Sequence, residues 1–207
     1  MGPYLVTIAR QYGSGGREVG HKLAELTGYT FYDRQMITLA AEKSGLSVDA
    51  LSHADETAAN SFLYSMVTSS AAYNRGLDAV HLPLNDRLFV LQSQIIKEHS
   101  DDGNGSIFVG RCADYVLNGS PNLVLVFIEA PFETRVATVM ERHGLDKDEA
   151  ESLVVKTDKR RANYYNYYTG EKWGKVDRYD LVVSTGRIGV DGAAAMIRHY
   201  LDELDKQ

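Results

Sequence analysis

The chain has little cysteine, little proline and no long apolar run. Cys112 is its only cysteine, so no disulfide can form within the chain, and a reducing compartment is allowed. No stretch is apolar over the roughly 20 residues that a membrane-spanning helix needs, and the N-terminus lacks the pattern of a signal peptide. These absences predict a cytoplasmic protein with no membrane partner.

The chain also lacks an excess of basic residues. Its 22 Lys and Arg stand against 28 Asp and Glu, for a formal net charge of -6. General nucleic-acid binding depends on neutralising many phosphates, so we expect no nucleic-acid partner, although a local basic site is compatible with this charge. The 207 residues are 44% apolar and 24% charged, which predicts one globular domain with a substantial core.

Short β-rich runs alternate with amphipathic stretches, which is typical of an α/β domain with a parallel sheet. The strand candidates are residues 4–9, 30–32, 107–109, 123–129 and 181–184. The segments between these strand candidates carry apolar residues at helical spacing. One helix is predicted to end at the C-cap Gly28, another to begin at Pro83, a third to cover 131–143 and stop at Gly144, and the last to cover 190–204.

The first strand candidate runs into a glycine-dense turn that an amphipathic helix follows at once (TIARQYGSGGREVG, residues 7–20). Glycines permit positive φ and let backbone N–H groups approach an anion, and the helix N-terminus adds unpaired donors. The spacing nearly matches a P-loop. Counting back from Gly16, Gln11 replaces the first motif glycine, and Arg17-Glu18 replaces the Lys-Ser/Thr pair.

This turn predicts a phosphate cradle made by Gly13, Ser14, Gly15, Gly16, Arg17 and Glu18. Arg17 keeps the positive charge of the missing lysine and can fork onto phosphate oxygens. Glu18 supplies no hydroxyl, but its carboxylate can hold magnesium directly or through water. The alternative is a plain strand-to-helix turn in which Glu18 is merely favourable at a helix N-terminus.

Polar residues follow two further strand candidates. Asp33 and Arg34 come directly after the second strand, and Arg111 and Asp114 follow the third. Open α/β sheets bind ligands outside the carboxyl ends of their strands, so we expect these residues to face the same site as the glycine turn. Taken singly, each arginine is as well explained by a surface ion pair.

The segment 156–179 concentrates basic and aromatic residues, with Arg160 and Arg161 next to each other and four tyrosines close behind. On a helix, adjacent arginines point about 100° apart, so we expect only one of them to reach a central site. The tyrosines pack this segment or form a subunit contact of a homodimer, or else they stack on a nucleobase or ribose. Both interpretations stay open at this point.

Four blocks resemble the cytidylate kinase-like proteins: TIARQYGSGGREVG, FYDRQMI, IFVGRCADYVL and DKRRANYYNYYTGEKWG. The resemblance spans essentially the whole chain and is weak over 47–82. It implies a P-loop fold like that of the nucleoside monophosphate kinases, with three α/β/α layers and a five-stranded parallel sheet. On this basis residues 1–207 form one domain, with a helical acceptor-side insert over 46–100 and a mobile lid over 156–179.

The resemblance also implies roles for individual residues. Residues 13–17 would hold the phosphates of ATP, and Asp33 falls where cytidylate kinases place an aspartate after the second strand. Arg111 matches the arginine that meets the acceptor nucleotide, although Cys112 replaces the aspartate that follows it in those kinases. Arg160 and Arg161 match the lid arginines.

The expected activity is ATP-dependent phosphoryl transfer to a small phosphorylated acceptor, a nucleoside monophosphate in the first instance. Catalysis would rest on Arg17, Arg160 and Arg161, and acceptor binding on Asp33, Arg34, Arg111 and Asp114. Phosphates and water would hold Mg²⁺, with Glu18 or Asp33 as outer ligands. The altered P-loop keeps a nucleotide-binding sensor open as an alternative, and the unfamiliar insert keeps open a kinase of a non-nucleotide metabolite.

Overall fold

The computed structural model describes residues 3–33, 84–100 and 103–206. Within these ranges the strands form a single five-stranded parallel sheet in the order β2-β3-β1-β4-β5. Its strands are β1 (Leu5–Arg10), β2 (Thr30–Tyr32), β3 (Ser106–Val109), β4 (Leu123–Glu129) and β5 (Leu181–Ser184). All five strand predictions are confirmed, to within one residue at each end.

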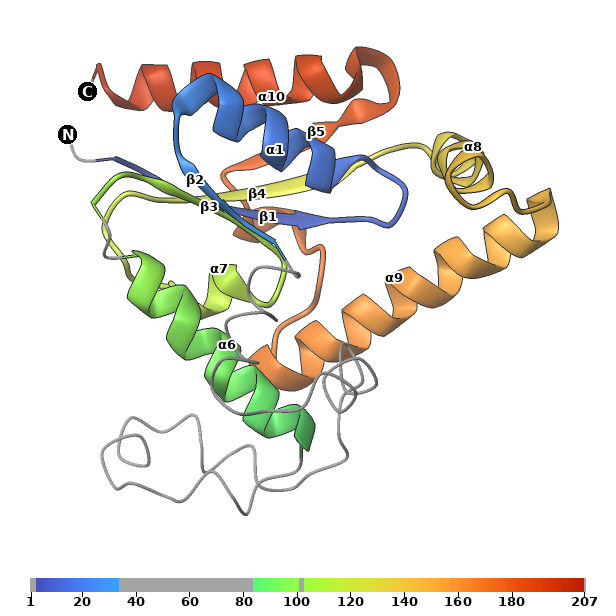
Figure 1. The fold of residues 1–207 in the computed structure, drawn as a ribbon, viewed down its shortest axis with the longest axis horizontal. Coiled ribbons are helices and arrows are strands. Elements are labelled where there is room, and N and C mark those ends of the chain that lie inside the picture. Colours follow the sequence, from blue (N-terminus) through green and yellow to red (C-terminus); the bar gives the residue numbers. More distant parts are fainter. Residues whose placement is uncertain (1–2, 34–83, 101–102, 207) are drawn as a thin grey trace.

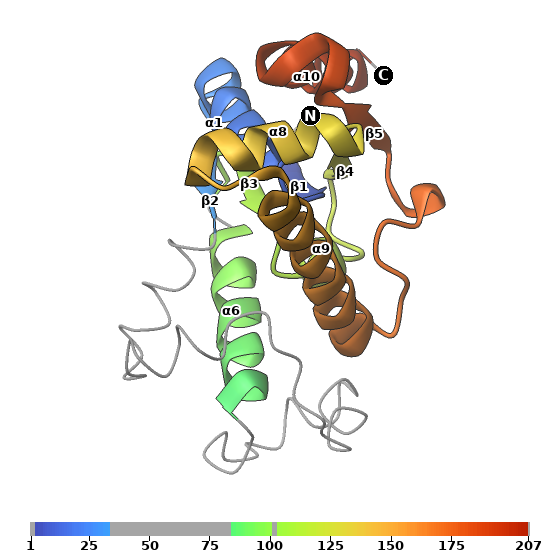
Figure 2. The ribbon, with the colours of Figure 1, turned by 90° about the vertical axis from the view of Figure 1, so that its right-hand side faces the viewer.

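Helices cover both faces of the sheet, which makes the three layers visible in Figure 1. One face carries α1 (Gly16–Thr27) and α10 (Thr185–Leu204), and the other carries α6 (Leu84–Ser100) and α7 (Ala113–Val116). At the carboxyl end of the sheet, α8 (Phe132–His143) leads into α9 (Lys147–Thr169), which runs back toward the start of α6 (Figures 1 and 2).

Alternate residues of each strand enter different cores, as the two-residue repeat of a strand requires. On β1, Val6 and Ile8 join the core under α1 and α10, whereas Leu5 joins the core under α6 and α7. Thr7 shares the second face and is almost fully buried there. The face of the sheet that carries Thr7 is also the face that α9 approaches.

Left-handed glycines end the helices where the sequence predicted. Gly28 closes α1 with φ 74°, and Gly144 closes α8 with φ 66°. The last helix is longer than predicted because a short turn beginning at Thr185 precedes it, and Gly189, with φ 64° and ψ -172°, interrupts the helical backbone between the two.

The segment 156–179 is the C-terminal part of α9 followed by a loop and the short 3₁₀ helix η2 (Val176–Arg178). A capping box of Asp146 and Glu149 begins α9, which then runs for 23 residues and ends at Gly170 with φ 70°. The predicted lid therefore continues a helix that starts beside α8. Of the acceptor-side insert, residues 46–83 lie outside the described residues and the remainder is α6.

Among the residues that the structure places, no helix is long and apolar enough to cross a membrane. Cys112 lies buried at the start of α7, and burial raises the pKa of its thiol. This thiol is a small core group rather than a ready nucleophile.

Candidate functional site

The glycine turn between β1 and α1 has the conformation that the sequence predicted. Gly13 and Gly15 take φ values of 78° and 76°, and α1 begins at Gly16. A Cβ atom on Gly13 would lie 2.7 Å from the carbonyl oxygen of Arg135, so only glycine fits there. A Cβ atom on Gly16 would lie 2.5 Å from the Cβ of Arg10. The loop is therefore packed closely between β1 and α8.

Unpaired backbone donors gather along this loop and the first turn of α1. Among the described residues, no acceptor takes a hydrogen bond from the amides of Gly13, Gly15, Gly16, Arg17 and Glu18. The positive end of the helix dipole lies at the same point. Unpaired amides and a helix N-terminus together make an anion-binding site.

Ser14 has a different role from its neighbours, because its side chain turns into the protein. Its hydroxyl is buried and contacts the carbonyl oxygens of Gln11 at 2.8 Å and Ile128 at 3.2 Å. Thr185 Oγ1 in turn donates to the Ser14 carbonyl at 2.8 Å. The Ser14 side chain thus braces the loop against β4, and the Ser14 carbonyl ties it to α10.

The charged residues at the loop's end are paired. Arg17 Nε lies 2.7 Å from Asp33 Oδ2, and Glu18 Oε1 lies 2.6 Å from Arg142 Nη2. Arg17 remains half exposed, whereas the Asp33 side chain is buried. No cluster of three His, Cys, Asp or Glu side chains suited to a metal ion occurs in the described ranges. The paired carboxylates of Glu18 and Asp33 fit a magnesium ion that reaches the site with phosphates and water.

A second polar feature, a small pocket, lies where β1 and β3 end and α9 passes over the sheet. It has a volume of about 40 Å³, above the roughly 10–15 Å³ that one water needs. The Thr7 hydroxyl in its wall is buried without a hydrogen-bond partner among the described residues. The charged side chains of the wall are Arg10, Arg111, Asp114 and Arg161.

The turn that presents Arg111 is strained. Gly110, Arg111 and Cys112 all take positive φ, at 78°, 58° and 54°. For non-glycine residues, the left-handed conformation costs about 1–2 kcal/mol each. A Cβ atom on Gly110 would also collide with the guanidinium of Arg10. Strain of this kind is typical of functional sites, and here it holds a buried arginine in the pocket wall.

Arg161 faces the pocket, and Arg160 is exposed on α9. Arg161 Nη1 donates to the Arg10 carbonyl at 3.0 Å, and its guanidinium lies 5.4 Å from the centre of the Tyr12 ring. The structure thus brings one of the two adjacent arginines to the site, as the angular spacing of a helix requires.

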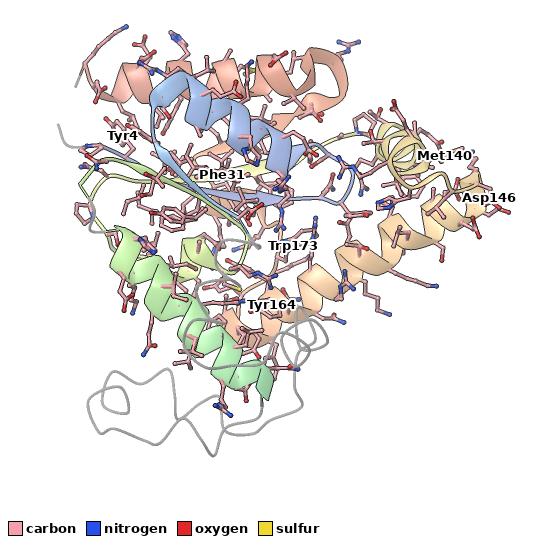
Figure 3. The ribbon with its side chains drawn as sticks, viewed as in Figure 1. Tyr4, Phe31, Met140, Asp146, Tyr164 and Trp173 are labelled. Carbon is pink, nitrogen blue, oxygen red and sulfur yellow. The ribbon has the colours of Figure 1, made fainter. Side chains whose placement is uncertain are left out.

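Three of the four tyrosines of α9 are core residues. Tyr164, Tyr165 and Tyr168 are buried against Phe89 of α6 and Cys112 of α7. Figure 3 shows Tyr164 and Trp173 on the side of the sheet where α6 and α7 lie, far from Asp146 at the start of α9. Packing within the chain therefore accounts for these rings, and two of them also line the pocket.

Asp114 is bonded to this aromatic cluster. Tyr165 OH donates to Asp114 Oδ2 at 2.6 Å. Burial raises the pKa of the Asp114 carboxyl, and the hydrogen bond from Tyr165 and the charge of Arg178 offset part of this rise. Asp114 therefore lies at the pocket as a buried carboxyl that keeps its proton more readily than an exposed aspartate does.

The structure unites most of the residues that the sequence singled out. Arg111, Asp114 and Arg161 share the pocket, and Asp33 lies at the glycine loop through its contact with Arg17. Arg34 lies outside the described residues. Sequence reasoning missed the residues that brace these features or complete the pocket, namely Thr7, Arg10, Arg135 and Asp158. A charged Arg10 at the end of an apolar strand was the one available signal.

The parallel sheet, the glycine loop ahead of α1 and the arginines over the carboxyl edge define a P-loop fold of the kinase type. A sequence model of the cytidylate kinase-like family matches residues 5–187, and the chain belongs to that family.

Relatives are similar over nearly the whole chain. A cytidylate kinase from Thermoplasma acidophilum is 25% identical over 205 residues, covering 98% of this chain and 94% of the relative. One from Methanopyrus kandleri is 24% identical over 209 residues and covers 97% and 94%. The structure of an uncharacterized protein from Eubacterium ventriosum superposes with a TM-score of 0.73 at 28% identity, covering 97% of this chain and 98% of that chain.

Two solved structures of kinases with other names share the fold. A shikimate kinase from Bacteroides thetaiotaomicron gives a TM-score of 0.55 at 12% identity, covering 96% of this chain and 98% of that one. A gluconokinase from Sinorhizobium meliloti gives 0.54 at 16% identity, covering 99% and 97%. At such low identity these likenesses concern the fold alone.

Proposed function

We propose that this protein transfers a phosphoryl group from ATP to a small phosphorylated acceptor, and that the acceptor is a nucleoside monophosphate. The observation that carries the proposal is the set of unpaired amides of Gly13, Gly15, Gly16, Arg17 and Glu18, close to a pocket lined by arginines. Membership of the cytidylate kinase-like family and the names of the matched relatives support the choice of acceptor.

The donor phosphates would bind along the loop amides and the first turn of α1. Arg17 would add its charge from the half-exposed position beside Asp33. Because phosphoryl transfer depends mainly on positioning and charge neutralisation, the loop needs no nucleophile of its own. Mg²⁺ that arrives with the phosphates would neutralise part of their charge. Glu18 and Asp33 would contact it only through water, since both already pair with arginines.

The acceptor's phosphate would enter the pocket at the end of β3. Arg111 and Arg161 bring two permanent positive charges to its wall, and Asp114 brings a carboxyl that can bond a hydroxyl or amine of the acceptor. Arg161 is the arginine best placed to neutralise charge between donor and acceptor, because it also contacts Arg10, the last residue before the loop. Arg160, and Arg34 outside the described residues, are candidates for further phosphate contacts.

A transfer assay tests the proposal. The protein is incubated with Mg²⁺ and ATP labelled on the γ-phosphate, together with a panel of nucleoside monophosphates, sugar phosphates and their unphosphorylated parents. We expect label to reach one or more nucleoside monophosphates. Label on an unphosphorylated metabolite would instead identify a metabolite kinase. ATP binding without transfer to any acceptor would favour a sensor.

A further inference from the structure

Side chains from two helices hold the backbone of Tyr12, at the start of the glycine loop, by its N–H and its carbonyl oxygen. Asp158 of α9 accepts a hydrogen bond from Tyr12 N through Oδ1 at 2.7 Å. Arg135 of α8 donates from Nη1 to Tyr12 O at 3.2 Å. The two side chains also pair with each other, with Arg135 Nη1 at 2.6 Å from Asp158 Oδ2. We call this arrangement the Tyr12 clamp.

The clamp is shielded from water. The Arg135 side chain is 9% exposed and that of Asp158 is 19% exposed, so the charges are little screened. Arg135 Nε also donates to the Ala130 carbonyl at 3.1 Å, which fixes the guanidinium to the end of β4. The backbone of Arg135 leaves no room for a Cβ atom on Gly13. The first turn of α8 therefore supports the loop directly.

Helix α9 contacts the chain on both sides of Gln11. Asp158 bonds the amide of Tyr12, and Arg161, three residues later on the same helix face, bonds the carbonyl of Arg10. A shift of α9 would move both contacts together. The position of the helix that carries the pocket arginine is thus linked mechanically to the conformation of the loop.

We infer that Arg135 and Asp158 are positioning residues of the phosphate loop, acting through the peptide groups of Tyr12. They hold the loop in its anion-binding form before a ligand arrives, so that binding does not have to order the backbone. Through the contact of Asp158 with Tyr12, the position of α9 also determines the conformation of the loop. The inference rests on the proposed function of the loop as a phosphate site, and it assigns to neither residue a contact with substrate.

The test compares substitutions on one helix. Asp158→Ala removes the contact of the clamp with the Tyr12 amide and the charge partner of Arg135. Asp158→Asn keeps an acceptor for Tyr12 N while removing the charge that faces Arg135. Asp148→Ala is the matched control, because Asp148 is exposed in the first turn of the same helix. Two readouts apply to the full chain: hydrogen exchange of residues 11–16 without ligand, and binding of inorganic tripolyphosphate by calorimetry.

In Asp158→Ala we expect faster exchange of the Tyr12 amide and of its neighbours in the loop. We also expect tripolyphosphate binding to weaken by about 5-fold to 30-fold, the factor for fixing one further residue of backbone. The KM for ATP should rise while the KM for the acceptor stays, and Asp158→Asn should fall between Asp158→Ala and wild type. Asp148→Ala should match wild type throughout.

Unchanged loop exchange in a folded Asp158→Ala protein would overturn the inference. If that variant does not fold, Asp158→Asn decides in the same way. If wild type binds neither tripolyphosphate nor ATP, the proposed function fails, but the exchange rates of the unliganded loop still decide whether the clamp positions it.

Discussion

Removing the Arg161 side chain should reduce transfer far more than removing that of its neighbour Arg160. Arg161 lies in the pocket wall and donates a charge-assisted hydrogen bond to the Arg10 carbonyl at 3.0 Å. A charge-assisted hydrogen bond from Arg161 to the transferring phosphoryl group would be worth about 1.5–3 kcal/mol, which corresponds to a loss of about 10-fold to 150-fold in kcat/KM on its removal. Arg160 is exposed, and an exposed charge contributes less than about 1 kcal/mol, or roughly 5-fold.

The assay is steady-state transfer from ATP to the acceptor found by the panel, measured for Arg161→Ala, Arg160→Ala and wild type. Calorimetry with ATP alone separates donor binding from the transfer step. If Arg161 acts on the transferring group, kcat falls more than ATP affinity does. Equal losses in the two alanine variants, or a normal rate in Arg161→Ala, would refute the placement of Arg161 at the centre of the site.

Four further outcomes are expected. Gly13→Ala should lower the free energy of unfolding by at least about 1–2 kcal/mol and weaken ATP binding, because φ is 78° and a Cβ atom there meets α8. Arg17→Ala should weaken ATP binding by about 1–3 kcal/mol and also destabilise the fold, since Asp33 is buried beside it. Asp114→Asn should become more stable relative to wild type as pH rises from below 3.8 to neutral. The pKa of the Asp114 carboxyl is raised in the folded protein, so the wild type loses stability as this buried group ionises over that interval. In hydrogen exchange, ATP with the acceptor should protect residues 156–161 further, whereas the buried tyrosines that follow should already be protected.

Each outcome has a control. Gly28→Ala introduces the same left-handed strain at φ 74° with no atom near the new Cβ, so it should destabilise without affecting ATP binding. Adding Asp33→Asn to Arg17→Ala should restore stability but not binding, and Arg17→Lys should keep much of the activity. A stability difference for Asp114→Asn that does not change with pH would contradict the assigned shift. Equal protection of 156–161 with and without ligands would make this part of α9 static.

Local sequence signals were enough to predict much of the fold. The apolar runs located all five strands, and Gly28 and Gly144 marked two helix ends, because these features depend on neighbouring residues. The length of α9 was missed for a different reason. The basic and aromatic composition of 156–179 suggested a separate lid, although no glycine or proline interrupts the helix between Lys147 and Thr169.

The site was only partly predictable. The glycine loop and Arg111 were found because residues at the carboxyl ends of parallel strands share one edge of the sheet. The partners that fix the loop could not be found this way. Asp158 lies 146 residues from Tyr12 in sequence, and no local pattern couples them. Arg17 follows the loop glycines directly in sequence, but its pairing with Asp33 depends on the distance between two strand ends that only the folded sheet sets.

The central claim is that the loop from Gly13 to Glu18 binds the phosphates of a nucleotide. Calorimetry of the wild-type protein with ATP, tripolyphosphate and adenosine tests it most directly. The account predicts that ATP and tripolyphosphate compete for one saturable site and that adenosine binds far more weakly, because the loop amides recognise the anion. Adenosine binding as tightly as ATP, with no competition from tripolyphosphate, would contradict the account.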